Sequence, residues 1–416
     1  MWQLQRNFVN SDNVEITNFT ITESGKRPPD SAIYINSSDE IIIRYNKIMR
    51  NNNGISLYSS TGNLIVGNVI ENNSSPGIFA VSIRDSLFCG NFIYKNMKGI
   101  ALYLSRNNFI VDNTLKDSKE EGIYLDVSSG NIIYHNSFIQ NTVQAWTNIK
   151  NAWDFEGEGN YWSDYNGSDF YIGLYKNETG SDGIGDEPYI INADNHDNFP
   201  LMGPFYSYDI RFGGDEYQIA LISNSTISNF NFMTGEETGN RILSFSVAGE
   251  YDSIGFCRVL IPIRVMNYAL IVLVDGEEIA PTFLSIQQES RRCVYFTYSH
   301  SARIVAIISS KWLSLYDTLL DDYNQLIEKF VMLNASYYDL LSNLSSLMGG
   351  YVQLQINYTR LYELYQELLQ MHNESLQNLR NLTYAFLAVT TLFIIVITYL
   401  SRRAHLTLSS VSADKG

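Results

Sequence analysis

The sequence predicts a mainly β protein: a right-handed parallel β-helix, then a small β-sandwich, a long α-helical coiled-coil stalk and one transmembrane helix. Three observations predict this order. A motif recurs about every 22 residues in the first half, apolar side chains recur every seven residues from 313 to 382, and an uncharged apolar stretch follows. The expected domains are the β-helix with its C-terminal cap at 1–203, the sandwich at 204–311, the stalk at 312–381, the membrane helix at 382–400 and a tail at 401–416.

The β-helix prediction rests on two registers of the repeat. Short apolar runs such as 41–43 and 64–66 precede a recurring Asn, and a second corner carries a G-I-x-L motif. One such repeat cannot bury its own apolar face, whereas coils stacked about 4.8 Å apart build a continuous core. We expect each Asn to bond to its equivalent in the neighbouring coils, and each Gly to supply a positive φ. The Asn residues are Asn46, Asn68, Asn91, Asn113 and Asn136, and the Gly residues are Gly54, Gly77, Gly99 and Gly122.

The outward register just before this Asn ladder holds the best polar pair. Its members are Arg44, Gly67, Gly90, Asp112 and His135. We expect Asp112 and His135 to be neighbours on adjacent coils. Cleavage of a polysaccharide needs paired carboxylates or an acid–base pair, and no second carboxylate shares this register, so a solvated surface pair is favoured over a catalytic one.

An aromatic cluster follows the last repeat. It could stack on sugar rings, or it could cover the last coil as a hydrophobic lid. The lid is favoured, because an open β-helix end exposes strand backbone. The cluster comprises Trp146, Trp153, Tyr161, Trp162 and Tyr165.

Four carboxylates lie in the loops after this cluster. Such an oxygen-rich segment could hold Ca²⁺, although Asp-Gly sequences also simply form turns. The candidate ligands are Asp182, Asp186, Asp194 and Asp197.

Residues 10–203 resemble NosD-like β-helix proteins, the group also described as carbohydrate-binding proteins and sugar hydrolases. The resemblance rests on GNYWSDY at 159–165, DGIGDEPY at 182–189 and DNFPL at 197–201. It implies a β-helix with a C-terminal cap, and the family name includes a periplasmic copper-binding role. Copper sites cluster His, Met or Cys, and this part of the chain offers only His135 and His196 with scattered Met. A copper-delivery role is therefore the less favoured one.

Strand-like runs separated by Gly, Asp and Ser turns between 205 and 310 predict the β-sandwich. The segments GFCRVLIP, VLVDGE and YFTYSHS resemble a domain of archaeal surface proteins. Cys257 and Cys293 fall in two of the predicted strands and could form one disulfide outside a cell.

The stalk prediction rests on eight heptads with Tyr or Phe at one core position and Leu, three residues later, at the other. The heptad phase passes unchanged through Gly349–Gly350, so a continuous helix in a homo-oligomer is favoured over an intramolecular hairpin.

The uncharged stretch Leu382–Leu400 is long enough to cross a bilayer. Arg402 and Arg403 follow it, which places the tail in the cytoplasm and the rest outside. Twelve Asn-x-Ser/Thr sequons are in keeping with an extracellular glycoprotein. The segment MWQLQRNFVN has no apolar export signal. We therefore expect a start upstream of the given sequence, the alternative being a tail-anchored cytosolic protein.

The charge of the chain limits its partners. The 416 residues contain 28 Lys+Arg and 44 Asp+Glu, a formal net charge of −16. Nucleic-acid binding needs a basic face, so we expect no nucleic-acid partner. The order of domains predicts a surface-anchored module for glycan binding or adhesion, with extracellular glycans or envelope proteins as partners and a structural envelope role as a related possibility. The alternative is a surface polysaccharide lyase or glycoside hydrolase.

Overall fold

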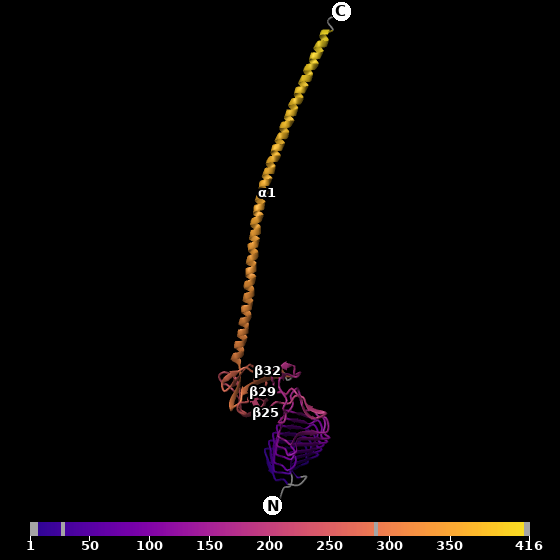
Figure 1. The fold of residues 1–416 in the computed structure, drawn as a ribbon, viewed down its shortest axis with the longest axis vertical. Helices are drawn as coiled ribbons and strands as arrows, with labels where there is room; N and C mark the ends of the chain where they lie inside the picture. The colour runs from indigo at the N-terminus through magenta and orange to yellow at the C-terminus, as the bar shows by residue number, and fades with distance from the viewer. Residues whose placement is uncertain (1–6, 26–29, 287–289, 412–416) are drawn as a thin grey trace. The chain divides into compact units, whose positions relative to one another are not determined.

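A computed structural model describes residues 7–25, 30–286 and 290–411, and it divides into two compact units, 1–317 and 318–416. The mainly β fold is confirmed. Unit 1 begins with stacked parallel coils, drawn in indigo to magenta in Figure 1, and continues into antiparallel sheets. One long helix leads into unit 2 and runs through it.

In the described part of the chain, the first six coils of the β-helix each contribute one short strand to each of three parallel sheets, and the last coil adds a strand to the first and third sheets only. The first sheet contains β1 (Asn7–Val9), β4 (Ser31–Asn36), β7 (Asn53–Tyr58), β10 (Ile78–Val81), β13 (Ile100–Tyr103), β16 (Glu121–Asp126) and β19 (Val143–Thr147). The second contains β2 (Glu15–Thr17), β5 (Ile42–Arg44), β8 (Leu64–Val66), β11 (Leu87–Cys89), β14 (Phe109–Val111) and β17 (Ile132–Tyr134). The third contains β3 (Thr20–Thr22), β6 (Lys47–Met49), β9 (Val69–Glu71), β12 (Phe92–Tyr94), β15 (Thr114–Lys116), β18 (Ser137–Ile139) and β20 (Tyr161–Trp162).

The strands pair in register, so equivalent apolar residues stack on one another inside the β-helix. Ile55, Ile78, Ile100 and Ile123 are successive partners in the first sheet, and all four are fully buried. Stacking of this kind gives one continuous core along the coils.

The structure has the Asn ladder that the repeat predicts. The backbone N–H and the side-chain Nδ2 of each Asn from Asn46 to Asn113 donate to Oδ1 of the next Asn along, at 2.9–3.0 Å. These amides therefore satisfy the buried polar groups of one turn in every coil. Two further ladders, which the sequence analysis missed, do the same at the other turns: Asn51–Asn73–Asn96 and Asn63–Ser86–Asn108–Asn131–Asn151.

The four corner glycines do not supply the positive φ that the sequence predicts. Gly54, Gly77, Gly99 and Gly122 are not among the residues with positive φ. A Cβ on Gly54 or Gly99 would lie 2.3 Å from the carbonyl oxygen of the equivalent Gly in the next coil. Glycine is needed here because the backbones of successive coils approach too closely for a side chain.

The last coil is closed by a cap that joins the three motifs of the NosD resemblance. It contains the short pairs β21 (Tyr171–Ile172) with β22 (Glu178–Thr179) and β23 (Tyr189–Asn192) with β24 (Asn195–Asp197). Leu201 forms isolated bridges with Tyr161 and Ile184, one residue from each of the other two motifs.

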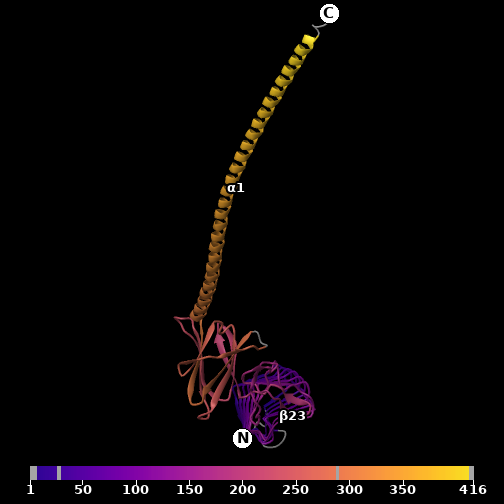
Figure 2. The same ribbon diagram turned by 45° about the horizontal axis from the view of Figure 1, so that its top comes forward.

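Two antiparallel sheets follow and pack face to face as a sandwich (Figure 2). The first contains β25 (Phe205–Phe212), β26 (Asp215–Ser223), β29 (Ile254–Pro262), β33 (Arg291–Ser299) and β32 (Thr282–Leu284). The second contains β27 (Thr226–Thr234), β28 (Arg241–Ala248), β34 (Arg303–Ser310), β30 (Ala269–Val274) and β31 (Glu277–Ile279). The sandwich sheet that contains β25 and β29 packs its outer face on the cap, where Phe205 and Leu260 share a core with Ile184 and Leu201.

The predicted disulfide is absent, since Cys257 and Cys293 are both free and buried. The two cysteines lie on adjacent strands, but Cys257 is opposite Phe296 and Cys293 is opposite Leu260. This offset of three residues turns the thiols to opposite faces of the sheet, one into the sandwich core and the other toward the cap.

Helix α1 (Lys311–Val411) runs through Gly349 and Gly350 without a break, so the chain has the continuous helix and not the hairpin. Its 311–402 portion contains a segment long and apolar enough to cross a membrane. Of the predicted tail, residues 412–416 lie outside the described part of the chain.

Candidate functional site

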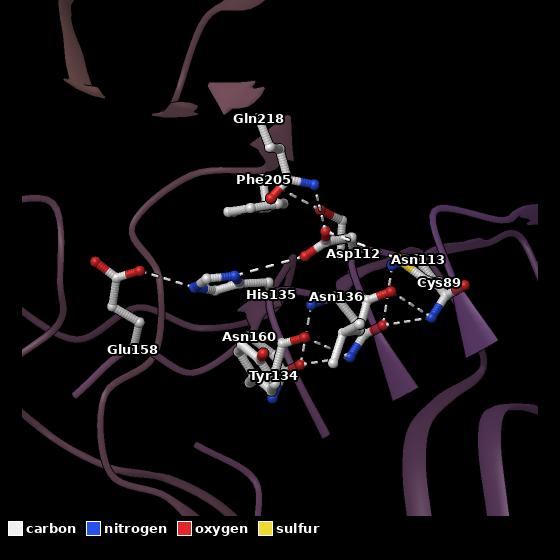
Figure 3. A network of polar contacts seen from close by, with 12 residues as sticks. Cys89, Asp112, Asn113, Tyr134, His135, Asn136, Glu158, Asn160, Phe205 and Gln218 are labelled. Atoms are coloured by element: carbon white, nitrogen blue, oxygen red, sulfur yellow. Dashed lines mark hydrogen bonds and ion pairs between the residues drawn. The ribbon is translucent and has the colours of Figure 1, made fainter. Parts of the chain in front are cut away.

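Asp112 and His135 belong to a buried chain of charged groups (Figure 3). Nδ1 of His135 lies 3.5 Å from Oδ1 of Asp112, and its Nε2 lies 2.7 Å from Oε2 of Glu158. The other carboxylate oxygen of Glu158 accepts hydrogen bonds from Nε and Nη2 of Arg258 at 3.0 and 2.7 Å. Arg258 also donates to the backbone oxygen of Asp182, whose carboxylate is 3.8 Å away. We call these five residues the junction network.

The β-helix positions the first two members of the network through the backbone. Asp112 and His135 precede ladder Asn residues and have φ values of 57° and 57°, a left-handed conformation shared by Gly67 and Gly90 in the same column. The predicted column is corrected at its first member. Arg44 lies in β5, and Tyr45, which directly precedes Asn46, holds the position equivalent to Gly67 in the coil before it. The predicted contact between Asp112 and His135 therefore forms on adjacent coils.

The expectation of a solvated pair is wrong, because the sandwich covers this surface. The side chains of His135 and Asp112 are only 11% and 10% exposed. Phe205 stacks on the His135 ring with centroids 4.2 Å apart, and Nε2 of Gln218 lies 3.4 Å from Oδ2 of Asp112. A second carboxylate does join the pair, from outside the repeats: Glu158 comes from the cap.

The network favours charged side chains despite its burial. Burial alone would lower the pKa of His135, but hydrogen bonds and attraction from Asp112 and Glu158 outweigh it and raise the pKa to about 9. For Glu158, burial is likewise outweighed by Arg258 and His135, which bring the pKa of the carboxyl to about 2. At neutral pH the network therefore contains an imidazolium and a guanidinium among carboxylates.

The space beside the network suits water more than a sugar. The adjoining cavity, lined among others by Tyr134, Glu158 and Arg258, measures about 60 Å³. Pockets for small ligands usually measure about 300 to 1,000 Å³, whereas a water needs only about 10 to 15 Å³ of such space. The network is best described as an ionic contact that holds the sandwich against the β-helix.

The predicted sugar-binding aromatics do not share one surface. Trp153 and Trp162 are buried in the core, and Trp162 stacks between Phe138 and Tyr189 as a lid on the last coil. Tyr161 and Tyr165 are half-buried in the cap. Trp146 is 37% exposed and lies apart from them, at one end of a different feature.

That feature is a row of aromatic rings along the outer face of the first parallel sheet of the β-helix. Each coil provides one ring, and neighbouring centroids are 4.5–5.9 Å apart. The two end residues are 50% and 37% exposed, and the others are partly exposed. We call it the aromatic row: Phe8, Tyr34, Tyr58, Phe79, Tyr103, Tyr124 and Trp146.

The aromatic row has no fixed sequence period, which explains why it was missed. In the pairing register Tyr34 is opposite Ser56, and Phe79 is opposite Ala101. In these two coils the ring comes instead from Tyr58 and Tyr103, two residues further along the strand. A shift of two keeps the side chain on the outer face, so the row continues through two adjacent columns.

The four candidate calcium ligands have separate partners. Asp197 is fully buried and ends the Asn ladder, accepting from the backbone N–H of Asn160 at 2.7 Å and from Trp162 Nε1 at 2.8 Å. Burial raises its pKa to about 7, although these hydrogen bonds act in the opposite direction. Asp182 faces Arg258, Asp186 accepts from the Phe170 N–H, and Asp194 is exposed. No three His, Cys, Asp or Glu side chains in the described ranges gather so as to hold a metal ion.

Comparison with known proteins gives partial matches. The periplasmic alginate epimerase matches with 22% identity and a TM-score of 0.30, over 35% of each chain, so this chain spans about a third of the epimerase. The Dettilon tailspike protein matches with 12% identity and a TM-score of 0.27, over 71% of this chain and 73% of the tailspike. The phiAB6 tailspike, solved with oligosaccharides of an Acinetobacter baumannii surface polysaccharide, matches with 11% identity and a TM-score of 0.21, over 72% and 67%.

A search of curated proteins found no match. Residues 4–167 match the model of the NosD family, described as periplasmic copper-binding protein, so the resemblance seen in the sequence is confirmed for the β-helix.

Proposed function

We propose that this protein is a membrane-anchored glycan-binding protein that binds extended polysaccharide along the aromatic row. The observation that carries the proposal is the row itself: seven partly exposed rings in an unbroken line on one face of the β-helix. Large apolar side chains that remain exposed together commonly mark an interaction site.

The form of the row fits a linear polymer. Its rings follow the coil spacing of about 4.8 Å, so the surface offers similar contacts at every step along the axis. The rings from Tyr34 to Tyr124 are tilted against one another by 33–54° and are partly exposed, so they are not closed off in one parallel stack. The CH groups of sugar rings can pack on such surfaces as other apolar groups do.

The helix supplies the anchor in this proposal. Residues 382–400 cross the membrane, and Arg402 follows on the cytoplasmic side. The heptad core residues of the stalk, such as Tyr323, Leu326 and Tyr337, are 56–64% exposed in the single chain. We propose that copies of the same helix cover them in a homo-oligomer, which would present several aromatic rows together.

A binding experiment with the full chain in neutral-detergent micelles tests the proposal. Wild type and Y58A/Y103A are applied to a panel of immobilised polysaccharides, and retention and released reducing ends are measured together. We expect wild type to be retained without releasing reducing ends, and Y58A/Y103A to lose this retention. The control Y175A/Y251A removes two tyrosines that are 83% and 84% exposed elsewhere, and it should bind as wild type does. Equal retention of Y58A/Y103A and wild type would contradict the proposal, and cleavage would favour the enzyme alternative.

A further inference from the structure

A polar groove runs across four coils of the β-helix, at the turn that leads from the third parallel sheet to the first parallel sheet. It measures about 560 Å³ and lies within the usual size range of ligand sites. Four of its lining residues, Arg50, Asn72, Lys95 and Asp117, directly follow β6, β9, β12 and β15. They occupy one column, since the N–H groups of Arg50, Asn72 and Lys95 donate to the carbonyls of Glu71, Tyr94 and Lys116 in the next coil.

The charge of this groove is opposite to that of the chain. Its lining holds Arg50, Lys95 and Lys119 against Asp117, which gives 3 − 1 = +2, in a chain with a net charge of −16. At physiological ionic strength charges more than about 8 Å apart are largely screened. A ligand in the groove therefore experiences the local positive charge more than the negative charge of the whole chain.

The cations of the groove remain available to a ligand. Lys95 and Lys119 are exposed and form no ion pair with any residue in the described ranges. Arg50 lies 4.0 Å from Glu23, but both side chains are more than half exposed, and ion pairs of this kind contribute little. By contrast, neighbouring Lys47 and Lys98 already face Glu71, Glu120 and Glu121.

The groove and the aromatic row lie on the same coils of the β-helix, at the turn after the third parallel sheet and on the first parallel sheet. Lys98, from the same corner, places its Nζ 4.5 Å from the centre of the Tyr124 ring. Arg50 and Lys95 are two coils apart, about 10 Å at the spacing of parallel strands. Cations therefore recur along the groove in the same direction as the rings recur along the row.

We propose that this basic groove, formed by Arg50, Asn72, Lys95, Asp117 and Lys119, binds the carboxylates of an acidic polysaccharide of the polyuronate class. The inference rests on the proposed glycan-binding function and adds the class of glycan. Arg50 and the two lysines attract the carboxylates, and Asn72, whose side-chain amide donates to Glu71, lines the groove beside them. Asp117 opposes the ligand and limits its affinity.

The test uses the full chain in neutral-detergent micelles with polygalacturonate and with its fully methyl-esterified form, in which a methyl ester replaces each charged carboxylate. Wild type should bind polygalacturonate more tightly, and the difference should shrink as ionic strength rises. K95A/K119A should bind polygalacturonate roughly three- to tenfold more weakly, whereas D117N should bind it more tightly. The matched control R84A/R106A removes two exposed cations from another corner of adjacent coils and should change binding by less than about twofold.

Each other outcome overturns a defined part of the account. If the free and esterified polymers bind equally, glycan binding stands and the polyuronate inference fails. If R84A/R106A weakens binding as much as K95A/K119A does, attraction is spread over the surface and the groove is not the site. If neither polymer nor any neutral polysaccharide binds, both the inference and the proposed function fail.

Discussion

Replacing Arg258 by Met should break the junction network and destabilise the whole of unit 1. The Arg258 side chain is 5% exposed, and that of Glu158, its partner at 2.7 Å, is 9% exposed. The substitution leaves two buried carboxylates, Glu158 and Asp182, without their guanidinium. Breaking a buried ion pair in this way typically costs about 3–5 kcal/mol.

This cost corresponds to a measurable change in melting temperature. A unit of 317 residues that unfolds cooperatively has an unfolding entropy of about 0.67 kcal/mol/K, so Tm should fall by about 5–8 °C. The assay is thermal unfolding of the full chain in detergent, followed by tryptophan fluorescence and by circular dichroism at strand wavelengths. The matched control is Arg211→Met, whose exposed partner is Glu216. It should change Tm by no more than about 1 °C.

A double variant separates a true ion pair from loss of packing. R258M/E158M removes both charges, so its loss should be smaller than the sum of the two single losses by about 0.5–3 kcal/mol. Strict additivity, or a Tm for Arg258→Met equal to that of the Arg211 control, would refute the description of the network as an ionic contact that holds the sandwich.

Three further predictions follow from the β-helix and its junction. His135 has a pKa of about 9 in the folded protein against an ordinary value of 6.5. Protonated His135 should therefore stabilise the folded protein by on the order of 3 kcal/mol, a contribution that is full below pH 6.5 and is lost as pH rises through 9. A plot of Tm against pH should show this loss for wild type and not for His135→Asn. Gly99→Ala should cost about 1–3 kcal/mol in urea unfolding, because its Cβ would meet the Gly122 carbonyl. Gly90→Ala has open space and meets only the backbone strain of a φ of +63°, so a smaller cost for Gly99→Ala than for Gly90→Ala would contradict the close approach of the coils. In a glycosylating host, Asn73 should stay unmodified by mass spectrometry, because its side chain is buried and donates to Asn96, whereas exposed Asn177 is accessible.

The parts of the fold that repeat could be predicted from sequence. The Asn ladder and the meeting of Asp112 with His135 follow from residue spacing alone, since equivalent positions stack in a β-helix. The role of the glycines was misjudged because spacing shows that a small residue recurs without showing which clash it avoids. The disulfide was mispredicted because the faces of Cys257 and Cys293 depend on the pairing register of β29 with β33.

The candidate site was only half predictable for the same reason. Glu158 and Arg258 lie outside the repeats, so only the packing of cap and sandwich on the coils brings them to His135. The aromatic row changes column between coils, as the step from Tyr34 to Tyr58 shows. A search for a single sequence period therefore finds neither the two outside members of the network nor the aromatic row.

Hydroxyl-radical footprinting of the full chain, with and without a bound polysaccharide, tests the central claim most directly. Ligand should protect Tyr58, Phe79 and Tyr103 from oxidation while Tyr251, which is 84% exposed in the sandwich, reacts as before. A polysaccharide that binds without protecting the aromatic row would contradict the account.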